Sequence, residues 1–364
     1  MAGKFERKKL RDCCLADSFF DSLKQDYPKF EEWFRGKAKE GEEAFVFEDD
    51  KGLCAFVYLK ENENEEIKLK NGTLPKADRI KIRTLKLDDR QQGQRLGEGA
   101  IGIVLWKWQK TNVDEIYLTV YDTHTDLIAL IEKYGFVCKG ELFNDSYDEN
   151  KKELVYVKSK KSINYTTPFT SFPFINSDFD SASMLPIYDD FHDRLLPYSE
   201  LKNTEQEFWD EAAGNGISKV FIGSPFNIKG ICNNNPVFIY RIYRGTDGAP
   251  TYKSCITSFG TITKVIVVKN EGKAQMSIDE FIKICGNKTI FDDDGLRVAY
   301  KRKNLVIFEF VYNGFFGKGK NVIHKALKDS GLFQTYPYEI RYTREEFYKI
   351  VEMGGVNVQD IIIN

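Results

Sequence analysis

Near its middle, the 364-residue chain contains a segment, Ser162 to Asp193, that has no lysine and no arginine. The segment is rich in Ser, Thr, Phe and Pro, and its apolar residues follow neither the helical nor the strand period. Such a shift is typical of a connector, and the length of the chain favours two domains. We therefore expect one domain over residues 1–161, a linker over 162–190 and a second domain over 191–364.

Charge excludes one broad class of function. The 53 Lys and Arg residues are balanced by 55 Asp and Glu, which gives a formal net charge of -2. Both signs are spread through both halves, so neither half predicts nucleic-acid binding through bulk charge. Hydrophobic residues make up 42% and are sufficient for a packed core. Aromatic residues reach 14%, which indicates core packing first and base-stacking surfaces only second.

The 7 cysteines and 3 histidines predict neither a disulfide framework nor a metal site. The cysteine count is odd, no CxxC pair occurs, and Cys13 and Cys14 are adjacent, which suits no ordinary bridge. The histidines lie far apart, so a zinc site is not expected. No apolar run reaches the roughly 18 residues of a membrane span. The start, MAGKFERKKL, lacks the apolar region of a signal peptide, and we expect a soluble, cytoplasmic protein without a membrane partner.

The first half predicts alternating strands and helices. AFVFE and LCAFVYL flank the turn DDKG and predict a hairpin. Within Arg79–Leu87 the apolar alternation shifts by one residue near Thr84, which indicates either a β-bulge or an imperfect strand. A glycine loop, a helix from near Leu96, the strand EIYLTVY, the helix TDLIALIEKY and two further strands follow. This order is typical of an α/β domain, in which the acidic run Glu61–Glu66 predicts a solvated loop.

The glycine loop itself, QGQRLG, lies between a strand and a helix. Backbone N–H groups at a helix N-terminus lack intrahelical partners and attract phosphate, and glycine allows a close approach. Arg95 is able to add a charge-assisted hydrogen bond. An ordinary turn is the alternative interpretation of this loop.

RQQGQRLGEGAI, EIYLTV and LIALIEKYGFVCKGE, in that order, resemble the GNAT acetyltransferase family over roughly residues 1–160. The resemblance implies a mixed, splayed α/β sheet with flanking helices, a loop that holds the pyrophosphate of acetyl-CoA, and a strand edge that pairs with its pantetheine. An arginine, Arg95, stands where the family has its middle glycine. The implied cofactor contacts are Leu85, Lys86, Leu87, Gln92, Gly93, Gln94, Arg95, Leu96, Gly97 and Glu98.

The catalytic residues depart from that family. The tyrosine that commonly protonates the leaving thiolate is replaced by Ile131, which cannot donate a proton. The remaining candidates are Tyr121 after the strand EIYLTVY, His124 at the start of the next helix, and Tyr134 directly before the Gly-Phe pair. The missing tyrosine also leaves room for a protein that binds an acyl-CoA without catalysis.

KVFIGSP, NNNPVFIYRIYRG and YKSCITSFGTITKV resemble the PUA-like superfamily, in its ASCH and EVE branches, over residues 185–364. This resemblance implies a mainly β, partly open barrel with inserted helices, and a pocket for RNA or a modified base. Core packing is an equal alternative for its tyrosines. Arg297–Lys303 is the most basic segment that contains an aromatic residue; it could contact a ligand, and a solvated hairpin is the alternative interpretation. Separately, Thr204 and Glu207 predict a helix capping box. The implied pocket residues are Ser224, Tyr240, Arg241, Tyr243, Arg244 and Ser258.

Together these features predict an acetyl-CoA-dependent N-acetyltransferase. Its acceptor is expected to be an amine. The more specific expectation is an RNA-linked amine, such as aminoacyl-tRNA or a nucleotide-like substrate, that the second domain presents. Two alternatives remain: a protein or small-amine acetyltransferase with a regulatory second domain, and a non-catalytic protein that binds acyl-CoA and RNA.

Overall fold

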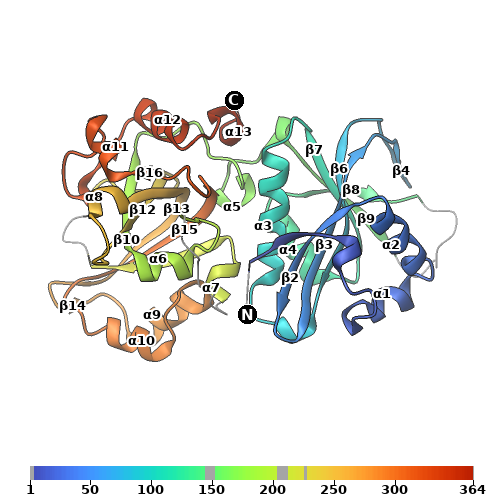
Figure 1. The fold of residues 1–364 in the computed structure, drawn as a ribbon, viewed down its shortest axis with the longest axis horizontal. Helices are drawn as coiled ribbons and strands as arrows, with labels where there is room; N and C mark the ends of the chain where they lie inside the picture. The colour runs from blue at the N-terminus through green and yellow to red at the C-terminus, as the bar shows by residue number, and fades with distance from the viewer. Residues whose placement is uncertain (1–3, 144–151, 203–211, 225–227, 364) are drawn as a thin grey trace. The chain divides into compact units, whose positions relative to one another are not determined.

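The computed structural model describes residues 4–143, 152–202, 212–224 and 228–363. The chain forms two compact units, Met1–Asn164 and Tyr165–Asn364 (Figure 1). The segment 162–190, predicted as a linker, contributes helix α5 (Pro168–Ser171) and strand β10 (Ala182–Tyr188) to the second unit. Most of this segment is therefore folded, and the division falls after Asn164. The capping box predicted at Thr204 and Glu207 lies outside the described residues.

The first unit is built on a seven-stranded sheet with the order β1-β2-β3-β6-β7-β9-β8. Neighbouring strands run antiparallel except β6 and β7, which are parallel. The strands are β1 (Glu6–Lys9), β2 (Glu43–Asp49), β3 (Gly52–Glu63), β6 (Arg79–Leu87), β7 (Glu115–Tyr121), β8 (Val137–Glu141) and β9 (Glu153–Ser159), with β4 (Ile67–Leu69) and β5 (Gly72–Leu74) as a separate hairpin. The helices are α1 (Asp21–Asp26), α2 (Phe30–Lys39), α3 (Leu96–Gln109) and α4 (Thr125–Lys133), with short 3-10 turns η1 (Leu10–Asp12), η2 (Ser18–Phe20), η3 (Asp89–Gln91) and η4 (Lys160–Ser162).

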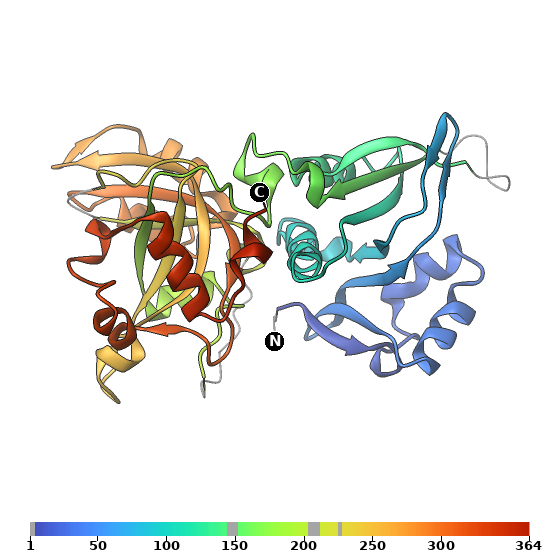
Figure 2. The ribbon, with the colours of Figure 1, turned by 90° about the horizontal axis from the view of Figure 1, so that it is seen from above.

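Helices α1 and α2 lie beside the part of this sheet formed by β2 and β3 (Figure 2), and aromatic residues of η2 and α2 pack against β3. Phe20, Phe30 and Phe34 share one buried cluster with Phe56 and Tyr58, alternate residues of β3. The rings of Phe20 and Phe56 meet edge to face at 5.3 Å. Such ring pairs add about 0.5–1.5 kcal/mol to the burial of their area. The aromatic excess in this half of the sequence therefore serves the core, as its composition indicated.

The second unit is built on an eight-stranded sheet whose main path is β11-β15-β13-β12-β10-β17. Its strands are β10, β11 (Ser218–Gly223), β12 (Pro236–Ile242), β13 (Cys255–Asn270), β14 (Lys273–Ala274), β15 (Leu305–Phe315), β16 (Val322–Ile323) and β17 (Arg341–Tyr342). Its helices are α5, α6 (Asp189–Leu195), α7 (Ala212–Asn215), α8 (Pro250–Lys253), α9 (Ile278–Cys285), α10 (Asp293–Ala299), α11 (His324–Asp329), α12 (Arg344–Met353) and α13 (Val358–Ile361), with turns η5 (Gly286–Lys288) and η6 (Pro337–Glu339). Among the described residues no pairing joins β17 to β11, so the sheet does not close into a barrel.

Two apolar clusters cover this sheet. One joins Phe238 of β12 to Phe347 of α12, whose rings stack at 4.8 Å. The other joins β11 and β15 to Phe281 of α9 and Leu296 of α10. The long strand β13 changes register three times along β15, and at one of these points Gly260 approaches the backbone of Val311. A Cβ at Gly260 would lie 2.4 Å from that carbonyl oxygen, so the close approach requires glycine.

All seven cysteines are free thiols in the structure. Within the described ranges, no group of three or more acidic, cysteine or histidine side chains could hold a metal ion. No described helix combines the length and the apolar character needed to cross a membrane.

Candidate active-site cleft

Strands β6 and β7 separate from each other, and the opening between them is the main feature of the first unit. Their parallel pairing covers only Arg79–Ile82 against Glu115–Leu118. Beyond this point β6 stays paired with β3 as far as Leu87, and β7 stays paired with β9 as far as Tyr121. Each strand therefore turns an open backbone edge toward the other over the described residues. We call this opening the strand wedge, formed by 83–87 of β6 and 119–121 of β7.

A bulge and an ion pair shape the two ends of the wedge. Thr84 pairs with Tyr58 and Ile82 with Leu59, so Arg83 is the extra residue that bends β6 away. The bulge that the sequence indicated near Thr84 is confirmed one residue earlier. At the closed end Arg79 is 2% exposed and donates from Nε to Glu115 of β7 at 2.6 Å. This ion pair, in which the arginine is buried, joins the two strands at the start of their paired stretch.

A cleft of about 760 Å³ lies along the wedge, and we call it the wedge cleft. Aromatic side chains of the α1–α2 region form one wall, and charged side chains of β3, β6 and β9 form the opposite wall. Arg83 lies over the ring of Trp33, 5.6 Å from its centroid. The aromatic lining residues are Tyr27, Phe30, Trp33 and Tyr121, and the charged ones include Lys29, Lys60, Glu63, Glu65, Lys81, Arg83 and Glu153.

Glu63 lines this cleft and has two close partners. It is 6% exposed, accepts a hydrogen bond from the Tyr117 hydroxyl at 3.0 Å and pairs with Lys60 at 2.5 Å. Burial alone would raise the pKa of Glu63, but these two bonds outweigh it and hold that pKa below its usual value. Burial lowers the pKa of neighbouring Lys81, whose ammonium lies 5.3 Å from the Tyr117 ring centroid. The prediction of a solvated loop over Glu61–Glu66 is therefore wrong for Glu63, which ends β3.

Glu153 has a different environment at the open end. It starts β9, is half-buried, and lies directly across from Tyr121 of β7 in the strand register. It lines the wedge cleft, yet it makes no side-chain hydrogen bond or ion pair with any described residue. His124 follows Tyr121, with ring centroids 6.3 Å apart, and lines the same cleft. Glu153 thus presents a carboxylate to the wedge cleft.

The predicted phosphate loop leads from η3 into α3. Gly93 has a φ of 85° and Arg95 a φ of 58°, a left-handed conformation that costs a residue other than glycine about 1–2 kcal/mol. Arg95 occupies the N-cap position of α3 without capping the helix through its side chain. Instead its guanidinium donates to Glu98 at 2.7 Å, and both side chains are largely buried. The arginine therefore turns away from the loop, while the first N–H groups of α3 have no intrahelical acceptor.

Gly97 has a packing role. A Cβ at this position would lie 3.2 Å from Leu130 of α4 and 3.3 Å from Leu87 of β6, so α3 needs glycine to approach both elements. The helix predicted to begin near Leu96 begins there. Of the predicted cofactor contacts on β6, Leu85 lines the wedge cleft, whereas Lys86 donates to Ser22 at 2.5 Å.

Of the three predicted catalytic residues, the structure brings Tyr121 and His124 into the wedge cleft. Tyr134 lies outside it, fully buried, and its hydroxyl donates to Glu98. Burial, together with the charge of Glu98, raises the pKa of Tyr134 well above its usual value. Such a hydroxyl is a poor proton donor, so Tyr134 fits a structural role.

Sequence patterns did not identify Glu63, Lys81, Arg83 or Glu153. Glu63 was hidden in an acidic run, and Glu153 starts an ordinary strand. Their common location depends on β9 pairing with β7 and on β3 pairing with β6, both between segments distant in the chain. The one available signal was the bulge, which marks where side chains of β6 change direction.

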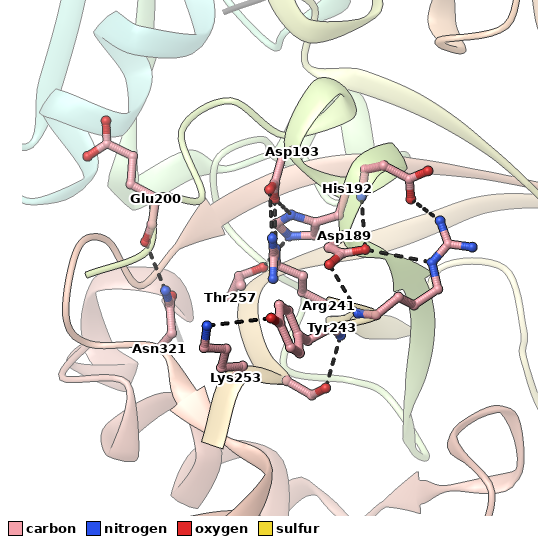
Figure 3. A network of polar contacts seen from close by, with 12 residues as sticks. Asp189, His192, Asp193, Glu200, Arg241, Tyr243, Lys253, Thr257 and Asn321 are labelled. Atoms are coloured by element: carbon pink, nitrogen blue, oxygen red, sulfur yellow. Dashed lines mark hydrogen bonds and ion pairs between the residues drawn. The ribbon is translucent and has the colours of Figure 1, made fainter. Parts of the chain in front are cut away.

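In the second unit, two of the predicted base-pocket residues, Arg241 and Tyr243, lie in a network of polar contacts (Figure 3). Arg241 is 7% exposed and donates from Nε and one terminal nitrogen to Asp193, both at 2.8 Å. His192 is fully buried, with Nδ1 2.7 Å from Asp193 and Nε2 2.7 Å from the Thr257 hydroxyl. Since a carboxylate only accepts, Nδ1 carries the proton, and the neutral ring accepts from Thr257. Ser258 is buried, and its hydroxyl oxygen lies 3.3 Å from that of Thr257.

The other predicted pocket residues are similarly placed. The Tyr240 hydroxyl is 2.7 Å from Nδ1 of His324, and Tyr240 is 4% exposed. The Lys253 ammonium donates to the Tyr243 hydroxyl at 3.5 Å, and Arg244 forms an ion pair with Asp190 at 2.6 Å. Ser224 lines a cleft of the second unit. The structure does not bring the six residues into one pocket, because the side chains of the other five bond residues outside the set.

No protein-family model matches the sequence, and no curated protein matches it. Solved acetyltransferases are similar to part of the chain. NAA60 of Arabidopsis thaliana, in complex with a bisubstrate analogue, shares 15% identity at a TM-score of 0.32 over 43% of this chain and 98% of its own. A GNAT-family acetyltransferase of Bacillus cereus has 13% sequence identity and a TM-score of 0.31, and the match covers 43% of this chain and 98% of that one. For an N-acetyltransferase of Staphylococcus aureus the identity is 15% and the TM-score 0.28, and the match covers 35% of this chain and 74% of that one.

These solved structures belong to the class that the motifs of the first half resemble. At such identities and TM-scores the likeness carries no inference about activity. None of the three is a PUA-like, ASCH or EVE protein, so that assignment of the second half stays a prediction.

Proposed function

We propose that the first unit is an acetyl-CoA-dependent N-acetyltransferase of the GNAT type. The observation that carries this proposal is the strand wedge, two facing strand edges that would pair with one extended ligand as an added strand. The wedge leads toward the N-terminus of α3, whose N–H groups suit phosphate. Residues 85–87 and the backbone of 92–98 would therefore hold the pantetheine and pyrophosphate of acetyl-CoA.

The wedge cleft supplies groups for the transfer of an acetyl group to an amine. Glu153 would remove a proton from the amine, directly or through water, as the nitrogen attacks the thioester carbonyl. Open N–H groups along the wedge would stabilise the oxygen that gains negative charge. As the C–N bond forms and the C–S bond breaks, the hydroxyl of Tyr121 would donate a proton to the departing sulfur. The second product is then the free thiol of CoA.

Cofactor binding is tested by a charge placed in the loop. Gly93 has open space around its Cβ position, and Asn and Asp tolerate its positive φ better than other residues. Gly93→Asp is expected to weaken CoA binding about tenfold or more, because a carboxylate faces the phosphates. Gly93→Asn has the same shape without the charge, and calorimetry should find its affinity within about threefold of wild type. Equal affinity of the two variants would contradict phosphate binding at this loop, and no binding to wild type would remove the proposal.

The proton donor is tested by two tyrosine variants. Tyr121→Phe is expected to lower kcat about tenfold or more without changing the free energy of unfolding. Tyr134→Phe is expected to leave kcat within about twofold and to lower the free energy of unfolding by about 1–3 kcal/mol, because buried Glu98 loses a hydrogen-bond donor. Acetyl-transfer rates and urea denaturation measure both quantities. A loss of kcat in Tyr134→Phe alone would reverse the two roles.

The acceptor is proposed to be an amine, and an RNA-linked amine presented by the second unit is the finer form of this proposal. That form is supported by the sequence resemblance of the second half. Mass spectrometry for acetylated products in total RNA, lysate protein and polyamines separates it from a protein or small-amine acceptor. If CoA binds and none of these pools is acetylated, the non-catalytic alternative is supported.

A further inference from the structure

A second cleft, of about 330 Å³, lies entirely within the second unit. Aromatic rings from five segments of the described chain line it: Tyr188 of β10, Phe191 of α6, Phe221 of β11, Phe291 before α10, and Tyr336 with Tyr338 around η6. We call it the aromatic cleft. Tyr188 and Tyr336 are 46% and 61% exposed, which is unusual for rings this large and places them within reach of a ligand.

The rings of this cleft are held in place from behind. Phe221 and Tyr338 each stack on Phe308 of β15, at 6.2 Å and 6.1 Å between centroids, with interplanar angles near 22° and 23°. The guanidinium of Arg244 lies 4.2 Å from the centroid of Tyr188 and covers one of its faces. A ligand that stacks here would therefore not have to order these rings first.

The hydroxyl of Tyr338 is one of the polar groups of the cleft, which Ser224 and Thr289 also line. Tyr338 is 7% exposed, yet its hydroxyl makes no hydrogen bond with any described residue. A Cβ at Gly223 would lie 2.8 Å from this oxygen, so glycine at that position makes room for it. A hydroxyl that lines a cleft and has no partner in the described part of the protein is available to hydrogen-bond a ligand.

The charge of the aromatic cleft comes from one cation. Arg302 lines it, is exposed, and makes no hydrogen bond or ion pair with its side chain in the described residues. Among the described residues that line the cleft, none is an aspartate or a glutamate. Arg302 belongs to the basic segment Arg297–Lys303, which is the end of α10 and the turn after it, not the predicted hairpin. An arginine without a carboxylate partner favours an anionic group.

We propose that the aromatic cleft binds a small planar aromatic anion, that is, a flat ring carrying one phosphate or carboxylate. The ring lies against Tyr336 and Tyr188, its anionic group bonds Arg302, and a polar ring atom bonds the Tyr338 hydroxyl. A nucleotide and an aryl carboxylate share this chemistry. The proposal is independent of acetyl transfer, because it uses no residue of the first unit.

Calorimetric titration of the full-length protein tests it with two matched pairs of probes. UMP is compared with uridine, and indole-3-acetate with indole-3-acetamide, so that each pair differs in the anionic group. The charged member of at least one pair is expected to bind about tenfold more tightly than its uncharged match. The pair with the tighter anion identifies the source as phosphate or carboxylate. Absence of saturable binding, or equal affinity within both pairs, would overturn the proposal.

Three variants assign this binding to the cleft. Arg302→Gln is expected to weaken the anion about tenfold and to leave its uncharged match unchanged. Tyr336→Ala is expected to weaken both members about tenfold, because each loses a stacking partner. Tyr338→Phe should weaken binding about three- to tenfold and leave the unfolding midpoint unchanged, since its hydroxyl has no partner to lose. Gly93→Asp in the first unit is the control with unchanged affinity. Binding that survives all three cleft variants would overturn the assignment.

Discussion

Glu153→Gln is expected to lower kcat for acetyl transfer by about 10²–10⁴-fold, the usual contribution of a general base. The amide has the shape of the carboxylate but cannot remove the proton of the attacking amine. Glu153 is chosen because it lines the wedge cleft across from Tyr121 and makes no hydrogen bond or ion pair with its side chain among the described residues. Binding of CoA does not require a base, so the Kd of the Glu153→Gln variant for CoA should remain within about threefold of the wild-type value.

The pH profile of kcat/KM separates a base from a residue that only shapes the cleft. In the wild type the rate should fall toward low pH as the base is protonated, and this limb should disappear in Glu153→Gln. Glu65→Gln is the matched control, because Glu65 lines the same cleft but its side chain is 69% exposed and pairs with Lys60. If Glu65→Gln and Glu153→Gln reduce kcat equally, Glu153 is not the base.

Asp193→Ala is expected to lower the free energy of unfolding of the second unit by about 3–5 kcal/mol. The carboxylate accepts two hydrogen bonds from Arg241 and one from His192, and both partners are buried. Alanine would leave the guanidinium without its counter-ion and the imidazole N–H without an acceptor. Urea denaturation followed by circular dichroism measures the change.

The neighbouring carboxylate provides a control for Asp193. Asp190 pairs with Arg244 at 2.6 Å, but their side chains are 54% and 47% exposed. Such a solvated pair is worth about 0–1 kcal/mol, so Asp190→Ala should change stability little. Similar losses in the two variants would mean that burial does not decide the strength of this network.

Acid should reduce the difference between wild type and Asp193→Ala. Burial alone would raise the pKa of Asp193, but the hydrogen bonds from Arg241 and His192 outweigh it and hold this pKa far below its usual value. A depressed pKa in the folded state contributes stability above the unfolded pKa of about 3.9, and this contribution is lost as pH falls below it. The difference between the two proteins is therefore expected to shrink below about pH 4.

The sequence predicted elements well where the signal was local. The alternation in Arg79–Leu87 carried the bulge, and the hairpin around DDKG and the helix from Leu96 were confirmed, because turn residues and side-chain period act over a few positions. The extent of the linker was harder to predict. Lack of lysine and arginine indicated a connector, yet β10 is an interior strand of a sheet, where charged residues are rare.

The candidate sites depended on pairing between distant segments, which no local pattern contains. The resemblance of the second half to PUA-like proteins implied that Tyr240 and Arg241 face a ligand. Their partners His324 and Asp193 come from elsewhere in the chain and complete their hydrogen bonds. The aromatic cleft was missed for the same reason. Tyr188, Phe221 and Tyr336 are unremarkable in sequence, and only the order of strands brings them to one place.

The separation of β6 and β7 also affects how the chain avoids self-association. Unpaired strand edges are templates for intermolecular sheet formation, and proteins normally protect them with charge, bulges or cover. Here both open edges belong to interior strands and face one another. A foreign sheet would have to enter between them, whereas a single slender chain would not. The unpaired N–H and C=O groups of the wedge are thus accessible to a narrow ligand but not to the edge of a second protein's β-sheet. This arrangement disfavours aggregation through these two strands.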